Sequence, residues 1–168
     1  YPMQRSLVVS EMCIRAAVTK LNDYTFYNCT LLSNVRLSNS LTNIGSYAFS
    51  VCKALTEISI PDNVITIGFR AFSSCANLIN IKIPNSIEEI NLDAFNGCTN
   101  LKYNASNGGL YLGNDVNKYI VLIDTETTDF TSFTISSTCR IIYQSAMLGC
   151  SQTSLTIPNS VVFIGKKA

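Results

Sequence analysis

The sequence predicts one solenoid domain of the α/β class, in which short coils stack and contribute strands to a parallel β-sheet. Three observations predict it. Cysteines recur every 23 residues, a phenylalanine stands three positions before each of them, and the following segment alternates apolar and polar residues. A unit this short cannot bury its own apolar side chains, so successive units must stack and share one core.

The repeated apolar positions define columns of core side chains. The columns hold Cys29, Cys52, Cys75 and Cys98; Phe26, Phe49, Phe72 and Phe95; and Leu32, Leu55, Leu78 and Leu101. Burial of one large apolar side chain stabilises a fold by about 1.5–3 kcal/mol. We therefore interpret the columns as the interior of the solenoid.

Each unit is expected to contain a strand followed by a short helical turn. Residues 78–83 alternate apolar and polar side chains and are rich in isoleucine, which is typical of a strand. Residues 67–75 carry apolar side chains three to four positions apart, which indicates one or two turns of α- or 3₁₀-helix. This pattern predicts a horseshoe-like solenoid with a concave parallel sheet and short helical turns on the convex side.

The repeat frame covers residues 1–168, so we expect a single domain of about six to seven coils with both ends inside a repeat. From Cys98 to Cys150 the chain has 52 residues, which is 29 more than one period. Residues 104–130 hold this excess. Apolar segments on both sides of Gly113–Lys118 predict that the excess forms an inserted β-hairpin.

Composition excludes several classes of function. The net charge is +1, so we expect no binding to nucleic acid. The chain has no histidine, no Cys-x-x-Cys pair and no local motif for a nucleophile with its base, so we expect no metal, no cofactor and no enzymatic activity. It also has no run of 18 apolar residues, so no membrane span is expected.

The cysteine column could form disulfides or could hold free thiols. Stacked side chains point the same way, whereas a disulfide needs Cβ vectors that converge. We therefore expect small, buried, reduced thiols. Cys13 is the exception, because its position in the repeat faces outward.

Residues Leu55–Cys75 follow the pattern L-x-x-I-x-I-P-x-x-I-x-x-I-G-x-x-A-F-x-x-C, and Leu78–Cys98 repeat it with Asn91 in place of glycine. This pattern resembles the BspA-type leucine-rich repeat. The resemblance implies a leucine-rich repeat solenoid from a surface or secreted protein that binds host proteins, matrix or other cells. It also implies a ladder of side chains that hydrogen-bond turn backbone, at Ser40, Asn63, Ser86, Thr138 and Ser160. The family motif contains no catalytic residues.

The resulting hypothesis is an extracellular or cell-surface adhesion module that binds a host, matrix or cell-surface protein, or a glycan. The candidate binding residues are Arg36, Glu57, Asn80 and Lys82 on the exposed sheet face, and Tyr111 and Tyr119 in the insert. Two alternatives stay open: an architectural spacer without a ligand, and a hydrolase assembled from scattered carboxylates and lysines. Uncapped repeats also predict end-to-end self-association.

Overall fold

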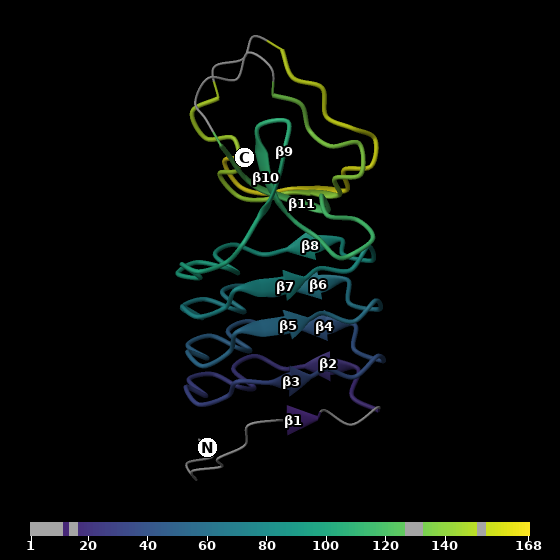
Figure 1. The fold of residues 1–168 in the computed structure, drawn as a ribbon. Helices are drawn as coiled ribbons and strands as arrows, with labels where there is room; N and C mark the ends of the chain where they lie inside the picture. The colour runs from purple at the N-terminus through teal and green to yellow at the C-terminus, as the bar shows by residue number, and fades with distance from the viewer. Residues whose placement is uncertain (1–11, 14–16, 127–132, 151–153) are drawn as a thin grey trace.

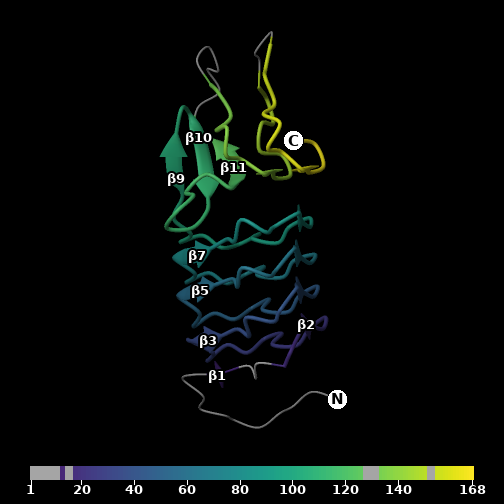
Figure 2. The same cartoon turned by 90° about the vertical axis from the view of Figure 1, so that its right-hand side faces the viewer.

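The computed structural model describes residues 12–13, 17–126, 133–150 and 154–168. Its coils stack in rows, and each row carries two short strands on different sides of the coil (Figures 1 and 2). One stack contains β1 (Met12–Cys13), β3 (Val35–Arg36), β5 (Glu57–Ser59) and β7 (Asn80–Lys82). The other contains β2 (Lys20–Leu21), β4 (Asn43–Ile44), β6 (Thr66–Ile67) and β8 (Glu89–Ile90). The sequence predicted only the first stack.

All strand pairs within these two stacks are parallel, and their register follows the repeat. Ile44 pairs with Ile67, and Ile67 pairs with Ile90, which makes β2-β4-β6-β8 one four-stranded sheet. In the other stack Ile58 pairs with Ile81. Each pair joins residues 23 positions apart, so the predicted register of the coils is confirmed.

The phenylalanines form one interior row, as the repeat predicted. Phe49 and Phe72 are fully buried, and the centroids of their rings lie 5.2 Å apart in a stacked arrangement. The rings of Phe26 and Phe49 are 5.1 Å apart, and those of Phe72 and Phe95 are 6.0 Å apart. The wider spacing occurs at the coil where Asn91 stands in place of glycine.

The segment that closes each coil is a series of turns, and the expected helical or 3₁₀ turns are not supported. Alternate N–H groups of this segment donate to the next coil, at 2.7–2.9 Å: Tyr47 to Phe69, Phe49 to Ala71, and Val51 to Ser73. The N–H groups between them donate three residues back within their own coil, as Ser50 does to Tyr47. An α-helix would instead satisfy these donors four residues back in the same segment.

Stacking distance explains why no helix forms here. Hydrogen-bonded coils lie about 4.8 Å apart, whereas an α-helix with its side chains is about 10 Å wide. Helices could therefore follow each other at every coil only if the solenoid opened like a fan on that side. With a hydrogen-bonded ladder on each side, the rows from β1 to β8 stack evenly, without the predicted horseshoe curvature (Figure 1).

The insert forms an antiparallel sheet that continues into the last coils. Strand β10 (Gly109–Leu112) pairs with β9 (Asn104–Ser106) and with β11 (Val121–Thr125). Strand β11 then pairs in parallel with β12 (Ile141–Ile142), and β12 pairs with β13 (Phe163–Ile164). The insert therefore has one strand more than the predicted hairpin, and it starts a sheet of five strands. The predicted limit at residue 130 lies outside the described residues.

The coil that contains the insert lacks a closing turn, and Gln144 compensates for it. In the preceding coil the N–H of Arg70 donates to the carbonyl of Leu92 in the next coil. The equivalent N–H of Asp93 has no such carbonyl, and it donates instead to Oε1 of Gln144 at 2.8 Å. Gln144 also donates from Nε2 to Oδ1 of Asp93, and the ring of Tyr143 packs at 5.9 Å from the ring of Phe95.

Two ladders of polar groups connect the coils. Cys52, Cys75 and Cys98 each donate the S–H to a phenylalanine carbonyl of the previous coil, as Cys75 does to Phe49 at 3.0 Å. Buried Cys139 donates instead to the carbonyl of Ile141 in its own coil. Ser86 donates to the carbonyl of Val64 at 2.6 Å, and Ser160 to that of Cys139 at 2.7 Å. Asn63 likewise donates to the carbonyl of Asn39, so three of the five predicted ladder residues bond backbone, and the acceptor belongs to the preceding coil. Thr138 donates instead to the side-chain oxygen of Asn117.

The last coil is less buried than the others. Ile164 is 51% exposed, although the equivalent Ile67 is fully buried. Ile157 is 45% exposed, and β13 is the outer strand of its sheet. Among the described residues, no helix has the length and hydropathy that crossing a bilayer requires.

Candidate binding face and groove

The parallel stack of β3, β5 and β7 gathers four of the six candidate residues on one exposed face. Glu57 pairs with Asn80 across β5 and β7, and Ser59 pairs with Lys82 in the same register. Arg36 lies on the preceding strand, β3, and its side chain is exposed. We call this surface, formed by Arg36, Glu57, Ser59, Asn80 and Lys82, the strand face.

The strand face ends against the insert. A parallel bridge joins Lys82 to Gly113, and the N–H of Ile83 donates to the carbonyl of Gly113 at 2.9 Å. The next residue after Lys82 in this column therefore comes from the insert, as Gly113, and not from the following repeat. Gly113 is required there, since a Cβ at this position would overlap the backbone of Asn117 and Lys118.

A turn at residues 114–117 projects from this contact. Oδ1 of Asn114 accepts hydrogen bonds from the N–H groups of Val116 at 3.0 Å and of Asn117 at 2.8 Å. Nδ2 of Asn114 donates to the carbonyl of Ile83 at 2.9 Å, which ties the turn to the coil below. Val116 at the tip of the turn is 92% exposed.

Lys82 and Asp115 form an ion pair between the strand face and this turn. Nζ of Lys82 donates to Oδ2 of Asp115 at 2.6 Å, and the two side chains are 51% and 80% exposed. An ion pair so open to water contributes about 0–1 kcal/mol to stability. Its main consequence is to position the turn and to neutralise the lysine charge at this end of the face.

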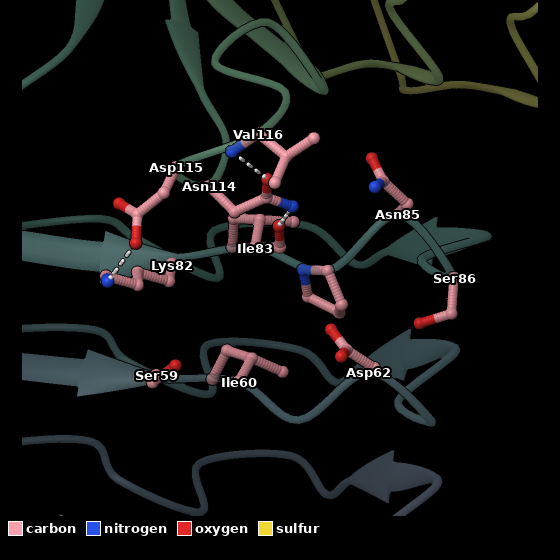
Figure 3. A pocket seen from close by; sticks show the side chains of 11 residues that line it. Ser59, Ile60, Asp62, Lys82, Ile83, Asn85, Ser86, Asn114, Asp115 and Val116 are labelled. Atoms are coloured by element: carbon pink, nitrogen blue, oxygen red, sulfur yellow. Dashed lines mark hydrogen bonds and ion pairs between the residues drawn. The ribbon is translucent and has the colours of Figure 1, made fainter.

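Below the turn lies an open groove of about 440 Å³ (Figure 3). The buried side chains of Ile60, Ile83 and Pro84 contribute its apolar lining. Its remaining lining consists of Ser59, Asp62, Lys82, Asn85, Ser86, Asn114, Asp115 and Val116. Seven of these eleven residues are polar or charged, so the groove is an open concavity with a mixed, mainly polar lining.

The two tyrosines predicted for the binding site lie elsewhere. Tyr111 is fully buried, and its hydroxyl oxygen accepts a hydrogen bond from the N–H of Ser136 at 3.1 Å. Tyr119 is half-buried and packs edge-to-face on Tyr111, with ring centroids 5.5 Å apart. Both side chains belong to the second core cluster, so Tyr111 is removed from the candidate contact residues.

Sequence reasoning did not single out the groove residues Asp62, Asp115 and Val116. They stand in predicted turns, and no local motif connects them. The parallel register brings them together, because the residues that follow β5 and β7 end beside the loop that follows β10. The signal that could have revealed them was Gly113-Asn114-Asp115, a turn sequence placed at the strand level of Lys82.

The reactive groups of the described residues do not form a catalytic constellation. No group of three or more His, Cys, Asp or Glu side chains there could hold a metal ion. The cysteines that the structure describes are all free thiols. Burial raises the pKa of Cys75 and Cys139 to about 11 and that of Cys98 to about 12, so these thiols stay protonated at neutral pH and are poor nucleophiles. The side chain of Cys13 lies outside the described residues.

A family model described as BspA type leucine rich repeat region matches residues 5–116 and 125–168, in six copies. No curated protein matches the chain. Three of the similar solved structures are leucine-rich repeat proteins from Bacteroides ovatus, T. pallidum and Eubacterium ventriosum. Their identities to this chain are 22%, 19% and 22%, and their TM-scores are 0.57, 0.55 and 0.51.

The alignments cover 93%, 92% and 94% of this chain, and 45%, 72% and 50% of the three solved chains in the same order. The chain therefore spans about half the length of the proteins from B. ovatus and E. ventriosum. At these identities the likeness shows the fold alone.

Proposed function

The chain belongs to the BspA-type leucine-rich repeat family, and on that basis we propose that it is a non-enzymatic protein-binding module of a cell-surface or secreted protein. Its partner in this proposal is a host, matrix or cell-surface protein. The partner contacts the strand face and enters the groove below residues 114–117. Extended strand faces are the surfaces that solenoid proteins commonly use for binding.

The observation that carries the proposal is the groove at the end of the strand face. The even stack of coils would otherwise present a flat polar surface. The turn at residues 114–117 overhangs this surface and creates a concave site in which polar groups surround Ile60, Ile83 and Pro84, and Val116 is exposed at its edge. A concave site with both apolar and polar lining residues favours a role in ligand binding. A flat polar surface would favour an ordinary solvated face.

The charges of this site favour contact with a polar protein surface. Lys82 and Asp115 neutralise each other, Arg36 is exposed two coils away, and Asp62 lies at the other end of the groove (Figure 3). Positive and negative groups alternate along the face, and such a pattern gives orientation and specificity to a protein contact. The absence of a catalytic constellation among the described residues supports the non-enzymatic part of the proposal.

We expect charge reversal on the strand face to weaken binding without changing stability. Arg36→Glu and Lys82→Glu should each weaken binding by about ten-fold, because exposed charges that complement a partner contribute on the order of 1 kcal/mol each. The measurement is surface plasmon resonance against purified extracellular-matrix proteins, with cell-binding assays in parallel. Each variant should keep the melting temperature of the parent within about 2 °C, since exposed sites change stability little.

Lys53→Glu is the matched control, because Lys53 is also exposed but lies in the turn segment away from the strand face. The control should bind like the parent chain. Equal binding by Arg36→Glu, Lys82→Glu and the parent would refute the strand face as the contact surface. If no matrix protein and no cell type binds the parent chain, the spacer hypothesis is favoured instead.

A further inference from the structure

A cluster of aromatic side chains lies on the turn side of the first coils, away from the strand face, with two rings exposed and two half-buried. We call Tyr24, Tyr27, Tyr47 and Phe69 the aromatic ridge. The rings of Tyr24 and Tyr47 are stacked at 4.8 Å with an interplanar angle of 6°. Tyr27 stands nearly perpendicular to both of them, and Phe69 stands nearly perpendicular to Tyr47 at 5.3 Å. Tyr24 is 55% exposed and Tyr27 is 49% exposed.

The repeat does not require these rings. The positions of Tyr24 and Tyr47 are occupied in later coils by Arg70, Asp93 and Ser145. A side chain that stabilised the coil itself would be expected at each repeat, as the buried phenylalanines are. Large exposed aromatic clusters are uncommon on soluble domains and mark interaction surfaces.

The backbone holds the ridge in place before any partner binds. The N–H of Tyr24 donates to the carbonyl of Ser46 at 2.8 Å, and the N–H of Tyr47 donates to that of Phe69 at 2.9 Å. Mutual stacking restricts the rings further. Rigid tyrosines give a large contact area at a low cost in conformational entropy, which is why tyrosine is enriched in binding hot spots.

The polar groups of the ridge favour a ligand that offers acceptors. The tips of the ridge are tyrosine hydroxyls, and the guanidinium of Arg70 lies 5.1 Å from the centre of the Phe69 ring. The neighbouring carboxylates already have partners: Oδ1 of Asp23 accepts from the N–H of Ser46, and Asp93 accepts from Arg70 and Gln144. The tyrosine hydroxyls can donate to acceptors of a ligand.

Proline-rich segments have the complementary chemistry. Proline has no N–H, so its polyproline II helix offers apolar rings and free carbonyl acceptors. That helix repeats every three residues, or about 9.3 Å. Two coils of the solenoid span about 9.6 Å, since neighbouring strands lie about 4.8 Å apart. If such a segment runs along the stack of coils, side chains three residues apart can contact the positions of Tyr24 and Arg70. These two positions are equivalent in the repeat and lie two coils apart.

We propose that the aromatic ridge binds a proline-rich, extended segment of a partner protein. This site goes beyond the proposed function, because it uses neither the strand face nor the groove. The aromatic ridge has the chemistry of other protein surfaces that bind polyproline II segments, which are lined by aromatic side chains.

The test is an NMR titration of the folded chain with a synthetic poly-L-proline peptide of about ten residues. We expect chemical-shift changes centred on the backbone amides of the aromatic ridge and not on those of the strand face. Tyr27→Ala should weaken binding by about five-fold, because one aromatic contact surface of the ridge is lost. Tyr27→Phe should weaken it by about two-fold, because only the hydroxyl donor is lost.

Leu31→Ala is the matched control, since Leu31 is apolar and 68% exposed but is not one of the aromatic side chains of the ridge. It should bind the peptide like the parent chain. Absence of shifts at the ridge would overturn the proposal, and so would equal affinities of Tyr27→Ala and the parent. A neutral oligosaccharide that shifts the ridge amides when the peptide does not would identify a glycan site instead. Arg36→Glu should leave peptide binding unchanged, which keeps this test separate from that of the proposed function.

Discussion

Raising the pH from about 9 toward 11 should progressively destabilise the protein, because buried thiols hold their protons in the folded state and lose them in the unfolded chain. Burial raises the pKa of Cys75 and Cys139 from 9.0 to about 11 and that of Cys98 from 9.0 to about 12. It also raises the pKa of Cys52. Stability contributed by these groups is complete below pH 9 and is lost as the pH rises toward 11 or 12.

The expected size of this effect follows from proton linkage. A thiol whose pKa rises by two units loses about 2 kcal/mol of its contribution by pH 11. Cys75, Cys98 and Cys139 together reach the order of 6 kcal/mol, which is comparable to the whole stability of an ordinary domain, about 5–15 kcal/mol. The measurement is urea unfolding at several pH values from 7 to about 11, with a reducing agent present.

Cys75→Ser and Cys75→Ala separate the two roles of the thiol. Both variants remove one titrating group. The free energy of unfolding should therefore fall less steeply above pH 9 in both, by about 1.4 kcal/mol per pH unit. Only the serine keeps a donor for the carbonyl of Phe49, so the alanine should be less stable at pH 7, by about 1 kcal/mol. A stability that does not change between pH 7 and 11 would contradict the buried, protonated ladder.

Gly68→Ala should destabilise the fold by about 2–3 kcal/mol, because the added methyl group would collide with backbone that cannot rotate away. A Cβ at Gly68 would lie 2.7 Å from the carbonyl carbon of Gly45 and 2.7 Å from the nitrogen of Ser46. Two neighbouring coils would have to separate, and the ladders between them would lengthen. The measurement is the free energy of unfolding in urea at pH 7.

Asn91→Ala is the matched control for this prediction. Asn91 occupies the glycine position of the next coil, where a Cβ is already accommodated, and its side chain makes only a long hydrogen bond of 3.4 Å to Ile67. We expect a loss of less than about 0.5 kcal/mol. If Gly68→Ala and Asn91→Ala lower the free energy of unfolding equally, the glycine column does not determine the distance between neighbouring coils.

The sequence predicted the core of the solenoid because columns of identical side chains leave little freedom. Phe49, Phe72 and Phe95 repeat at 23 residues, and only in-register stacking buries all three. The closing turns were harder to predict, since apolar residues three to four apart suit a helix and also suit consecutive turns. Tyr47 and Val51 adopt positive φ angles of 55° and 64°, which their residue types do not indicate.

The candidate site was predicted only in part. Alternation along each strand placed Arg36, Glu57, Asn80 and Lys82 on one face, and the structure agrees. The groove could not be predicted, because it forms where the insert contacts Lys82 through Gly113. The repeat pattern does not indicate which residue of the insert makes this contact. A usable signal, Asn107-Gly108, is typical of a two-residue hairpin turn and indicates the additional strand β9. The contact of Gln144 with Asp93 forms because the coil between them lacks a closing turn, and no sequence pattern near Gln144 indicates it.

The ladder between coils can be measured directly by NMR couplings across hydrogen bonds in a deuterated, isotope-labelled sample. The structure predicts couplings from the amide nitrogen of Phe49 to the carbonyl carbon of Ala71, and from that of Phe72 to Ala94. Both cross-peaks would establish parallel coils with the 23-residue register and turns that bond the next coil. Couplings from these amides to carbonyls four residues earlier would show a helix at this position and would contradict the fold on which the binding face, the groove and the ridge depend.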